Sequence, residues 1–194
     1  SGTLTLTGAH PSTGGTTISA GSLSAGDCGA NGGFTGNVTN NAVLAFDRSD
    51  AFTYPAVISG TGSVKKLGAG TLTLTGANTY SGGTTVQQGT LSLNSVNVTG
   101  YIANNATVTL SHAIDQGFSG TIAGTGNVVK LGAGRLTLTG ALTHTGGTTV
   151  SAGTLQVGSS NSAGHLGGNV VNNSAVAFAR SGDFVTYAGN MSGT

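Results

Sequence analysis

The sequence has very little charge. Only 6% of its 194 residues are charged, and glutamate is missing altogether, whereas an ordinary globular domain has about 25% charged residues. A helical protein needs Ala, Leu, Glu, Lys and Arg to cover its exposed faces. Thr, Ser, Val, Gly and Asn take their place here, and these residues favour short strands and tight turns. The composition therefore predicts an all-β protein.

Other scarce features exclude further classes. Cys28 is the only cysteine, which excludes an intramolecular disulfide and a multi-cysteine metal site. The formal charge of +1 argues against a nucleic-acid partner, because phosphates require a clustered basic surface. No stretch approaches the ~18 apolar residues of a membrane-spanning helix. No basic and then apolar leader opens the chain, so we expect any signal peptide to lie outside it.

The most prominent positive feature of the sequence is a long internal repeat. Leu67 begins LGAGTLTLTGANTYSGGTTVQQGTLSL and Leu131 begins LGAGRLTLTGALTHTGGTTVSAGTLQV, and 19 of these 27 positions are identical. The chain opens on a third copy, and each copy closes on ISGT, IAGT or MSGT. The pattern predicts one domain of three repeats, residues 1–61, 62–125 and 126–194, cut from a longer array.

Strands within the repeat are expected to be short. Leu72 to Thr75 alternates apolar and polar residues, which is typical of a half-buried strand. Gly or Asn separates nearly all such runs and allows corners with positive φ. Strands of three to five residues between brief corners favour a chain that stacks coil on coil. The predicted fold is a right-handed parallel β-helix of about nine coils of roughly 20–23 residues, three coils to a repeat. A β-sandwich or jelly roll is the structural alternative.

The repeat motif resembles a known family. The segment 68–91, GAGTLTLTGANTYSGGTTVQQGTL, closely resembles the autotransporter-associated β-strand repeat, also called the passenger-associated transport repeat, with its pattern GxLTLTGxNTYxGGTTVxxGTL. The third copy departs from this pattern at Leu142 and His144, and the first at His10 and Pro11. The resemblance implies the secreted passenger of a Gram-negative autotransporter, displayed outside the cell. It also implies a C-terminal translocator barrel in the parent protein.

Two arrangements of residues could suggest an enzyme. Ser111, His112 and Asp115 form a nucleophile, base and acid set, but three neighbours in one loop rarely converge as triads do. Glycoside hydrolysis needs paired carboxylates, and Asp47 and Asp50 are the only close pair. Because Arg48 lies between them, a surface ion cluster is the simpler interpretation. We predict no catalysis in this segment and keep a polysaccharide-processing β-helix enzyme as the alternative.

Metal and cofactor sites are not expected. The run from Gly32 to Asn37 faintly resembles a calcium-binding nonapeptide but lacks the aspartate that would bind the ion. His10, His144 and His165 have no second imidazole or carboxylate at ligand spacing. The sequence therefore predicts no cofactor and no metal.

Three variable loops interrupt the regular pattern, at Asp47–Tyr54, Ser111–Phe118 and Ala179–Tyr187; they are called loops 1, 2 and 3 below. Arg and Tyr are enriched at binding hot spots, and the first and third loops concentrate charge and aromatics, which predicts a contact ridge on the same side of successive repeats. The candidate contact residues are Arg48, Asp50, Tyr54, His112, Asp115, Arg180, Asp183 and Tyr187. The interpretation that we favour over this ridge is that these are longer loops whose Phe and Tyr cap the core.

The predicted function is a structural stalk or adhesin module. Its partners would be other copies of the chain or a host or matrix surface, and a self-assembling extracellular fibre is a further alternative. The parent protein would be anchored in the outer membrane or secreted.

Overall fold

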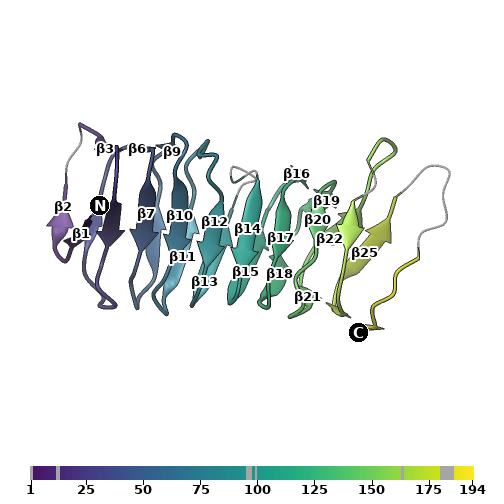
Figure 1. Ribbon diagram of the computed structural model, residues 1–194. Coiled ribbons are helices and arrows are strands. Elements are labelled where there is room, and N and C mark those ends of the chain that lie inside the picture. The colour runs from purple at the N-terminus through teal and green to yellow at the C-terminus, as the bar shows by residue number, and fades with distance from the viewer. Residues whose placement is uncertain (1, 12–13, 95–97, 99, 163, 180–185) are drawn as a thin grey trace.

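The computed structural model describes residues 2–11, 14–94, 98, 100–162, 164–179 and 186–194. All elements formed by these residues are β-strands, and the ladders between named strands are parallel. The strands wind coil after coil from the N-terminal end at the left of Figure 1 to the C-terminal end at its right. Nine strands succeed one another on one side. The prediction of an all-β parallel solenoid of about nine coils is confirmed.

Each coil visits three faces in turn, as shown by the succession of β14, β15, β16 and β17, in which the last strand returns to the sheet of the first. The first face is one sheet of nine strands: β1 (Thr3–Leu6), β4 (Ser22–Ala25), β7 (Val43–Phe46), β10 (Ser63–Lys66), β12 (Thr84–Val86), β14 (Tyr101–Asn104), β17 (Thr121–Ala123), β20 (Ala141–Leu142) and β23 (His165–Leu166).

The second face begins with the pair β2 (Ala9–His10) and β5 (Gly33–Phe34). It continues with eight strands: β8 (Phe52–Tyr54), β11 (Thr71–Leu74), β13 (Thr90–Leu93), β15 (Thr107–Ser111), β18 (Asn127–Leu131), β21 (Thr148–Val150), β24 (Val170–Asn172) and β26 (Met191–Ser192). The third face carries β3 (Thr16–Ile18), β6 (Val38–Asn40) and β9 (Ile58–Ser59), then β16 (Gln116–Phe118), β19 (Arg135–Leu138), β22 (Thr154–Val157) and β25 (Ala175–Phe178).

Coil length varies more than expected from the sequence. Paired residues of neighbouring coils are 17 positions apart at Leu91 and Val108, and 24 positions apart at Leu142 and Leu166. The extra residues lie in the corners, since the ladder hydrogen bonds fix the strands themselves. The corners therefore absorb insertions without disturbing the faces.

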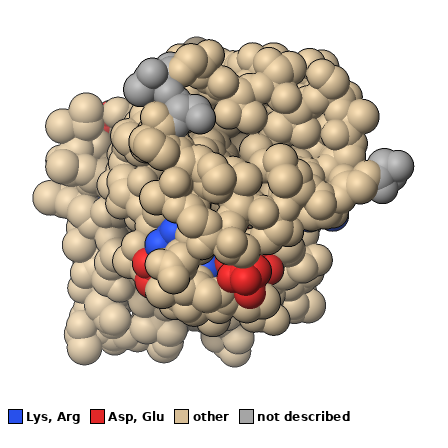
Figure 2. Space-filling view, turned by 90° about the vertical axis from the view of Figure 1, so that its left-hand side faces the viewer, with Lys and Arg blue, Asp and Glu red and all other residues tan. Residues whose placement is uncertain are grey.

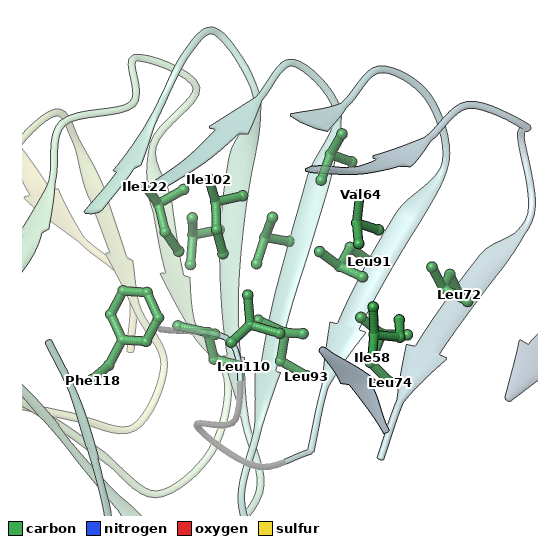
Figure 3. Packing of buried hydrophobic residues seen from close by; sticks show 14 of the residues in the cluster. Ile58, Val64, Leu72, Leu74, Leu91, Leu93, Ile102, Leu110, Phe118 and Ile122 are labelled. Atoms are coloured by element: carbon green, nitrogen blue, oxygen red, sulfur yellow. The ribbon is translucent and has the colours of Figure 1, made fainter. Parts of the chain in front are cut away.

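A column of apolar side chains fills the interior. In β11, Leu72 and Leu74 are buried, while Thr71 and Thr73 between them are half-buried. Leu72 is paired with Leu91 of the next coil, and Figure 3 shows these side chains pointing into the solenoid. Each fully buried side chain of this kind contributes about 1.5–3 kcal/mol relative to an exposed one, so the fold is held by stacking of like residues from coil to coil.

Two threonines depart from the expected outward orientation. Thr84 and Thr148 are each 2% exposed and point into the core. The Thr84 hydroxyl lies 2.6 Å from the hydroxyl of Tyr80, and that of Thr148 lies 3.2 Å from Nε2 of His144. Alternation of apolar and polar residues would place such threonines outside, but here a polar ring from the preceding corner reaches the core and needs a hydrogen-bond partner.

At another corner of the repeat, buried asparagine side chains form hydrogen bonds with backbone groups. Asn104 is fully buried; its Oδ1 accepts the N–H of Ala106 at 3.2 Å, and its Nδ2 donates to the carbonyl of Asn127 at 2.9 Å. Asn40 makes the corresponding bonds one repeat earlier. The repeated Asn-Asn-Ala segments thus mark corners that need a side chain to satisfy buried backbone groups.

The repeats are not stacked in phase. The TLTL strand of the first copy, β1, lies on the first face, its counterpart β11 lies on the second, and RLTL of the third copy, β19, lies on the third. From β11, the second face passes through β13 and β15 to β18 before the chain reaches β19. One repeat therefore occupies three coils and one further face, and the expected three coils per repeat is too short by a third of a coil.

Candidate functional site

Loop 1 is organised around Arg48. Its Nε and Nη2 donate to the two carboxylate oxygens of Asp50 at 2.9 and 2.7 Å. The guanidinium also donates to the carbonyls of Ala30, at 2.6 Å, and Gly32 in the preceding coil. It lies 4.7 Å from the centre of the Phe52 ring. The Arg48 side chain is only 13% exposed, so its donors are used to fasten loop 1 to the coil before it.

Asp50 is the part of this pair that faces solvent. Its side chain is 37% exposed, and the hydrogen bonds from Arg48 hold the pKa of this carboxyl below its ordinary value. Seen from the N-terminal end, acidic and basic side chains gather in one area of the surface (Figure 2). The Arg48–Asp50 pair is the one ion pair among the described residues.

Tyr54 is the last residue of loop 1, and its side chain points into the core. Its side chain is fully buried, and its hydroxyl donates to the carbonyl of Gly36 at 2.5 Å. Its ring packs against Phe34 and Phe46, with centroids 5.3 and 5.7 Å away. Burial raises the pKa of Tyr54 to about 12. This tyrosine supports the loop from below and does not reach the surface.

His112 of loop 2 occupies the position in its repeat that corresponds to Arg48 of loop 1. It is 1% exposed, and its Nδ1 lies 3.2 Å from the carbonyl of Asn94 in the preceding coil. Burial lowers the pKa of its imidazole. Arg48 and His112 therefore perform the same task, which is to bind backbone carbonyls of the coil before.

The remaining residues of loop 2 face outward. Asp115 is exposed and accepts the backbone N–H of Arg135 at 2.8 Å through Oδ1. Ile114 is 70% exposed. Among the described residues no hydrogen bond joins His112 to Ser111 or Asp115. His112 and Asp115 are thus directed to different partners, and the described residues do not form a catalytic triad here.

Loop 3 is described only at its ends. Arg180 and Asp183 lie outside the described residues. Tyr187 donates its hydroxyl to the carbonyl of Gly168 at 2.5 Å, and its ring lies 6.0 Å from that of Phe178. This repeats the arrangement of Tyr54 and Gly36 in loop 1.

The loops do not lie on one side of the molecule. Loop 1 follows β7 on the first face, loop 2 follows β15 on the second, and loop 3 follows β25 on the third. The structure brings Arg48, Asp50 and Tyr54 together at one corner and His112 and Asp115 at another. Loops 1 and 2 therefore do not share one side, as the expected ridge requires, because each repeat advances by one face beyond three coils.

Two inward-pointing lysines were not anticipated from the sequence. Lys66 and Lys130 are at most 2% exposed. The Lys130 ammonium donates to the carbonyls of Leu131 and Gly132, each at 2.7 Å. Lys66 likewise donates to Gly68 and to Gln88, and burial lowers the pKa of both ammonium groups. The signal was present, since period-2 alternation from a buried valine places each lysine inside, but the charge argues for the opposite orientation.

His144 is the site of a testable pH effect. It is 1% exposed, its Nε2 lies 3.0 Å from the carbonyl of Gly147, and its Nδ1 has no hydrogen-bond partner among the described residues. Burial lowers its pKa from 6.5, as for His112. The unfolded chain then binds more protons, so stability is fully present above pH 6.5 and is lost as the pH falls through the folded-state pKa.

His144→Tyr should weaken this acid sensitivity, because Tyr80 fills the same position one repeat earlier and does not titrate there. Urea unfolding followed by circular dichroism between pH 8 and 5 measures the effect. The variant should lose less unfolding free energy over this range than the unchanged chain. Equal losses in the two chains would show that His144 does not carry the effect.

The first repeat also contains a hollow and the lone thiol. The hollow, about 290 Å³, lies over the second face and is lined by Pro11, Phe34, Phe52 and Arg48 among others. Cys28 is exposed, with Sγ 3.4 Å from Oδ2 of Asp47. That hydrogen bond and the charge of Asp47 raise the pKa of the thiol, which lowers its reactivity.

The described residues contain no group of three His, Cys, Asp or Glu side chains able to hold a metal ion. None of their elements is a helix with the length and apolar character needed to cross a membrane.

Comparison with known proteins identifies the family of the chain. The profile of the passenger-associated transport repeat family matches residues 1–25, 64–93 and 128–157. The chain is 35% identical over 169 residues to a protein of Brucella suis biovar 1 (strain 1330) named Adhesin BmaC autotransporter. The alignment covers 73% of this chain and 5% of that relative, so the chain corresponds to a small part of such a protein. No solved structure matches the chain. The chain therefore belongs to the passenger-associated transport repeat regions of autotransporters.

Proposed function

We propose that this segment is a stalk of a surface-displayed passenger and that its corner loops carry adhesion. The observation that supports the proposal most strongly is the division between faces and corners. The first face is a continuous parallel ladder of nine strands and the second carries one of eight, while the variable loops lie where the chain turns from one face to the next. The name of the relative, an adhesin, supports the adhesive part. A regular scaffold that presents irregular loops is a common arrangement of binding proteins.

The coil-by-coil pairing also suits a chain that folds outside the cell. Each strand pairs with residues about one coil away, for example Val64 with Leu44 and Thr84. An emerging coil can therefore add to the one already folded, without waiting for distant segments. In this proposal the parent protein reaches the cell surface through a C-terminal translocator barrel, and it stays anchored in the outer membrane or is released.

The proposal narrows the set of residues that can touch a partner. Asp50, Asp115 and Ile114 present side chains to solvent. Arg48, Tyr54 and His112 act beneath them, and their role is to hold the loops in place. Tyr187, Arg180 and Asp183 of loop 3 remain predicted contact residues.

The test uses the parent protein displayed on a non-adherent bacterium. Asp50→Ala, Ile114→Ala and Asp115→Ala are combined in one variant, and Thr73→Ala with Thr85→Ala, on the outward faces, is the matched control. Attachment of cells to matrix-coated surfaces should fall at least several-fold in the loop variant, with unchanged surface display by antibody labelling. Equal attachment of the loop variant and the control would contradict an adhesive role of these loops.

Self-association is the second candidate function. The formal charge of +1 leaves little electrostatic repulsion between copies. In the same cells, clumping without matrix that is lost in the loop variant would favour contacts between copies. For the enzyme alternative, the release of products from a panel of polysaccharides by the purified chain would contradict a purely structural and adhesive segment.

A further inference from the structure

The outer surface of the second face carries a regular array of hydroxyl groups. In β11, β13 and β15, the residues Leu72, Leu91 and Val108 are buried in the core, and the residues on either side of each point away from it. Parallel pairing places these outward residues opposite one another, so they form two straight rows along the axis. One row consists of Thr71, Thr90, Thr107 and Asn127, the other of Thr73, Ser92, Thr109 and Val129, and both rows together are called the hydroxyl array below. Figure 1 shows β11, β13, β15 and β18 following one another in this order.

The array has a fixed spacing in two directions. Neighbouring coils are ~4.8 Å apart, and alternate residues of one strand are ~6.6 Å apart. Strands β13 and β15 are paired on both sides, so the rows cannot shift against each other without breaking the sheet. Branching at Cβ also restricts the rotamers of threonine. The surface therefore presents hydroxyl and methyl groups at positions that are set before any ligand binds.

The hydroxyl groups are available to a ligand. Those of Thr71, Thr73 and Thr90 form no hydrogen bond with the described residues, and the three side chains are half-buried on the outward side of their strands. Thr107 instead donates to Oδ1 of Asn127 at 3.0 Å, along its own row. A hydroxyl both donates and accepts, so the rows suit a ligand that offers donors and acceptors in turn.

The array contains none of the groups that usually anchor other ligands. Its members include no charged and no aromatic side chain, whereas protein partners are held mainly by Trp, Tyr and Arg and nucleic acids by Lys and Arg. An ion finds no counter-charge on it, and a sugar ring finds no aromatic face on which to stack. The ligand that fits is uncharged, flat and periodic in two directions. Ice meets this description, because the water oxygens of its prism faces repeat in a rectangular lattice with two spacings similar to those of the array.

We propose that the hydroxyl array is an ice-binding surface, on which threonine hydroxyls form hydrogen bonds with waters of the ice lattice and threonine methyl groups pack between these waters. A single such bond is weak, because liquid water competes for the same hydroxyl. A rigid array forms several bonds at once, and each bond after the first costs no further translational freedom. The site uses a face of the solenoid and does not depend on the contact role proposed for the loops.

The test measures ice growth in solutions of the purified chain. The unchanged chain should hold a single ice crystal without growth over a measurable interval below its melting point, and it should slow recrystallisation of a frozen solution. In the array variant, Thr73→Tyr with Thr90→Tyr, two large rings project from the flat surface and keep ice from the rows, while tyrosine remains a favourable strand residue. Both activities should then fall at least several-fold.

The matched control is Thr85→Tyr with Thr137→Tyr. These threonines are also half-buried and outward, but they lie in strands of the first and third faces. The control should keep the activity of the unchanged chain. Circular dichroism verifies that both variants fold, and the single change Thr73→Tyr replaces the array pair if the pair unfolds.

Three results would overturn the inference. The first is growth of ice in the unchanged chain as fast as in serum albumin at the same concentration, and the second is an array variant as active as the control. The third is a dimer, seen by light scattering, that the array variant loses and the control keeps while ice growth is unaffected, since the face would then bind a second copy of the chain. The assay involves no matrix and no loop residue, so its failure is distinct from a failure of adhesion.

Discussion

Tyr54→Ala is expected to lower the free energy of unfolding by about 3–5 kcal/mol. Tyr54 is fully buried and contacts Phe34, Phe46 and Phe52 in one aromatic cluster. Its removal leaves a cavity in the core and deprives the carbonyl of Gly36 of its hydroxyl donor. Urea unfolding followed by far-ultraviolet circular dichroism measures the change through the midpoint and the slope.

The control for Tyr54 is Tyr54→Phe. It keeps the ring and removes only the hydroxyl, so we expect a loss of about 1 kcal/mol. The difference between the two variants separates packing from hydrogen bonding. An alanine variant as stable as the phenylalanine variant would contradict the buried position of this side chain.

Gly70→Ala is expected to cost about 3 kcal/mol, at the upper end of the range for overpacking. A Cβ at Gly70 would lie 1.9 Å from the carbonyl oxygen of Asp50 in the preceding coil. The obstacle is backbone that is already held in the stack, since the N–H of Gly70 donates to Arg48 and that of Thr71 to Asp50. The coils cannot separate locally without breaking these bonds, so the clash is not relieved by a small shift.

Gly117→Ala is the matched control for the glycine substitution. Gly117 lies in strand β16, whereas Gly70 lies directly before β11, and the nearest atom to a Cβ added at Gly117 is 3.9 Å away. Its stability should stay within about 0.5 kcal/mol of the unchanged chain. Thermal and urea unfolding of both variants measure the contrast. A loss at Gly117 as large as that at Gly70 would mean that flexibility, and not close approach of the coils, explains the glycines.

Much of the fold follows from local pattern. The alternation in Leu72–Thr75 assigns inside and outside because strand side chains have a period of two. The spacing of Gly and Asn marks corners because these residues adopt or cap backbone conformations that others avoid. The same rule places Lys66 inside, and only the general cost of burying a charge argues against it. In the structure, carbonyls of the adjoining corner bind the ammonium and offset that cost.

The contacts of the loop residues could not be predicted from the local sequence pattern. Arg48 and Tyr54 belong to residue types that are frequent at interfaces, yet their partners lie in the preceding coil, 16 and 18 positions away. A single sequence does not show which carbonyls a long side chain will reach. The exposure of Ile114 has no signal in the sequence for a related reason, since an isolated apolar residue indicates nothing about a surface until its position in the fold is known.

The sequence by itself determined that this chain is a repeating all-β solenoid of the passenger-associated transport family, with three variable loops. Its motifs are local, and strand alternation and corner residues act within a few positions of one another. Only the tertiary structure decided which way the loops face. That direction depends on how many residues complete a coil, and parallel pairing between coils sets this number. Each repeat ends one face beyond a whole number of coils, which the sequence of the repeat does not show, and this remainder places loops 1 and 2 at different corners of the solenoid instead of on one ridge.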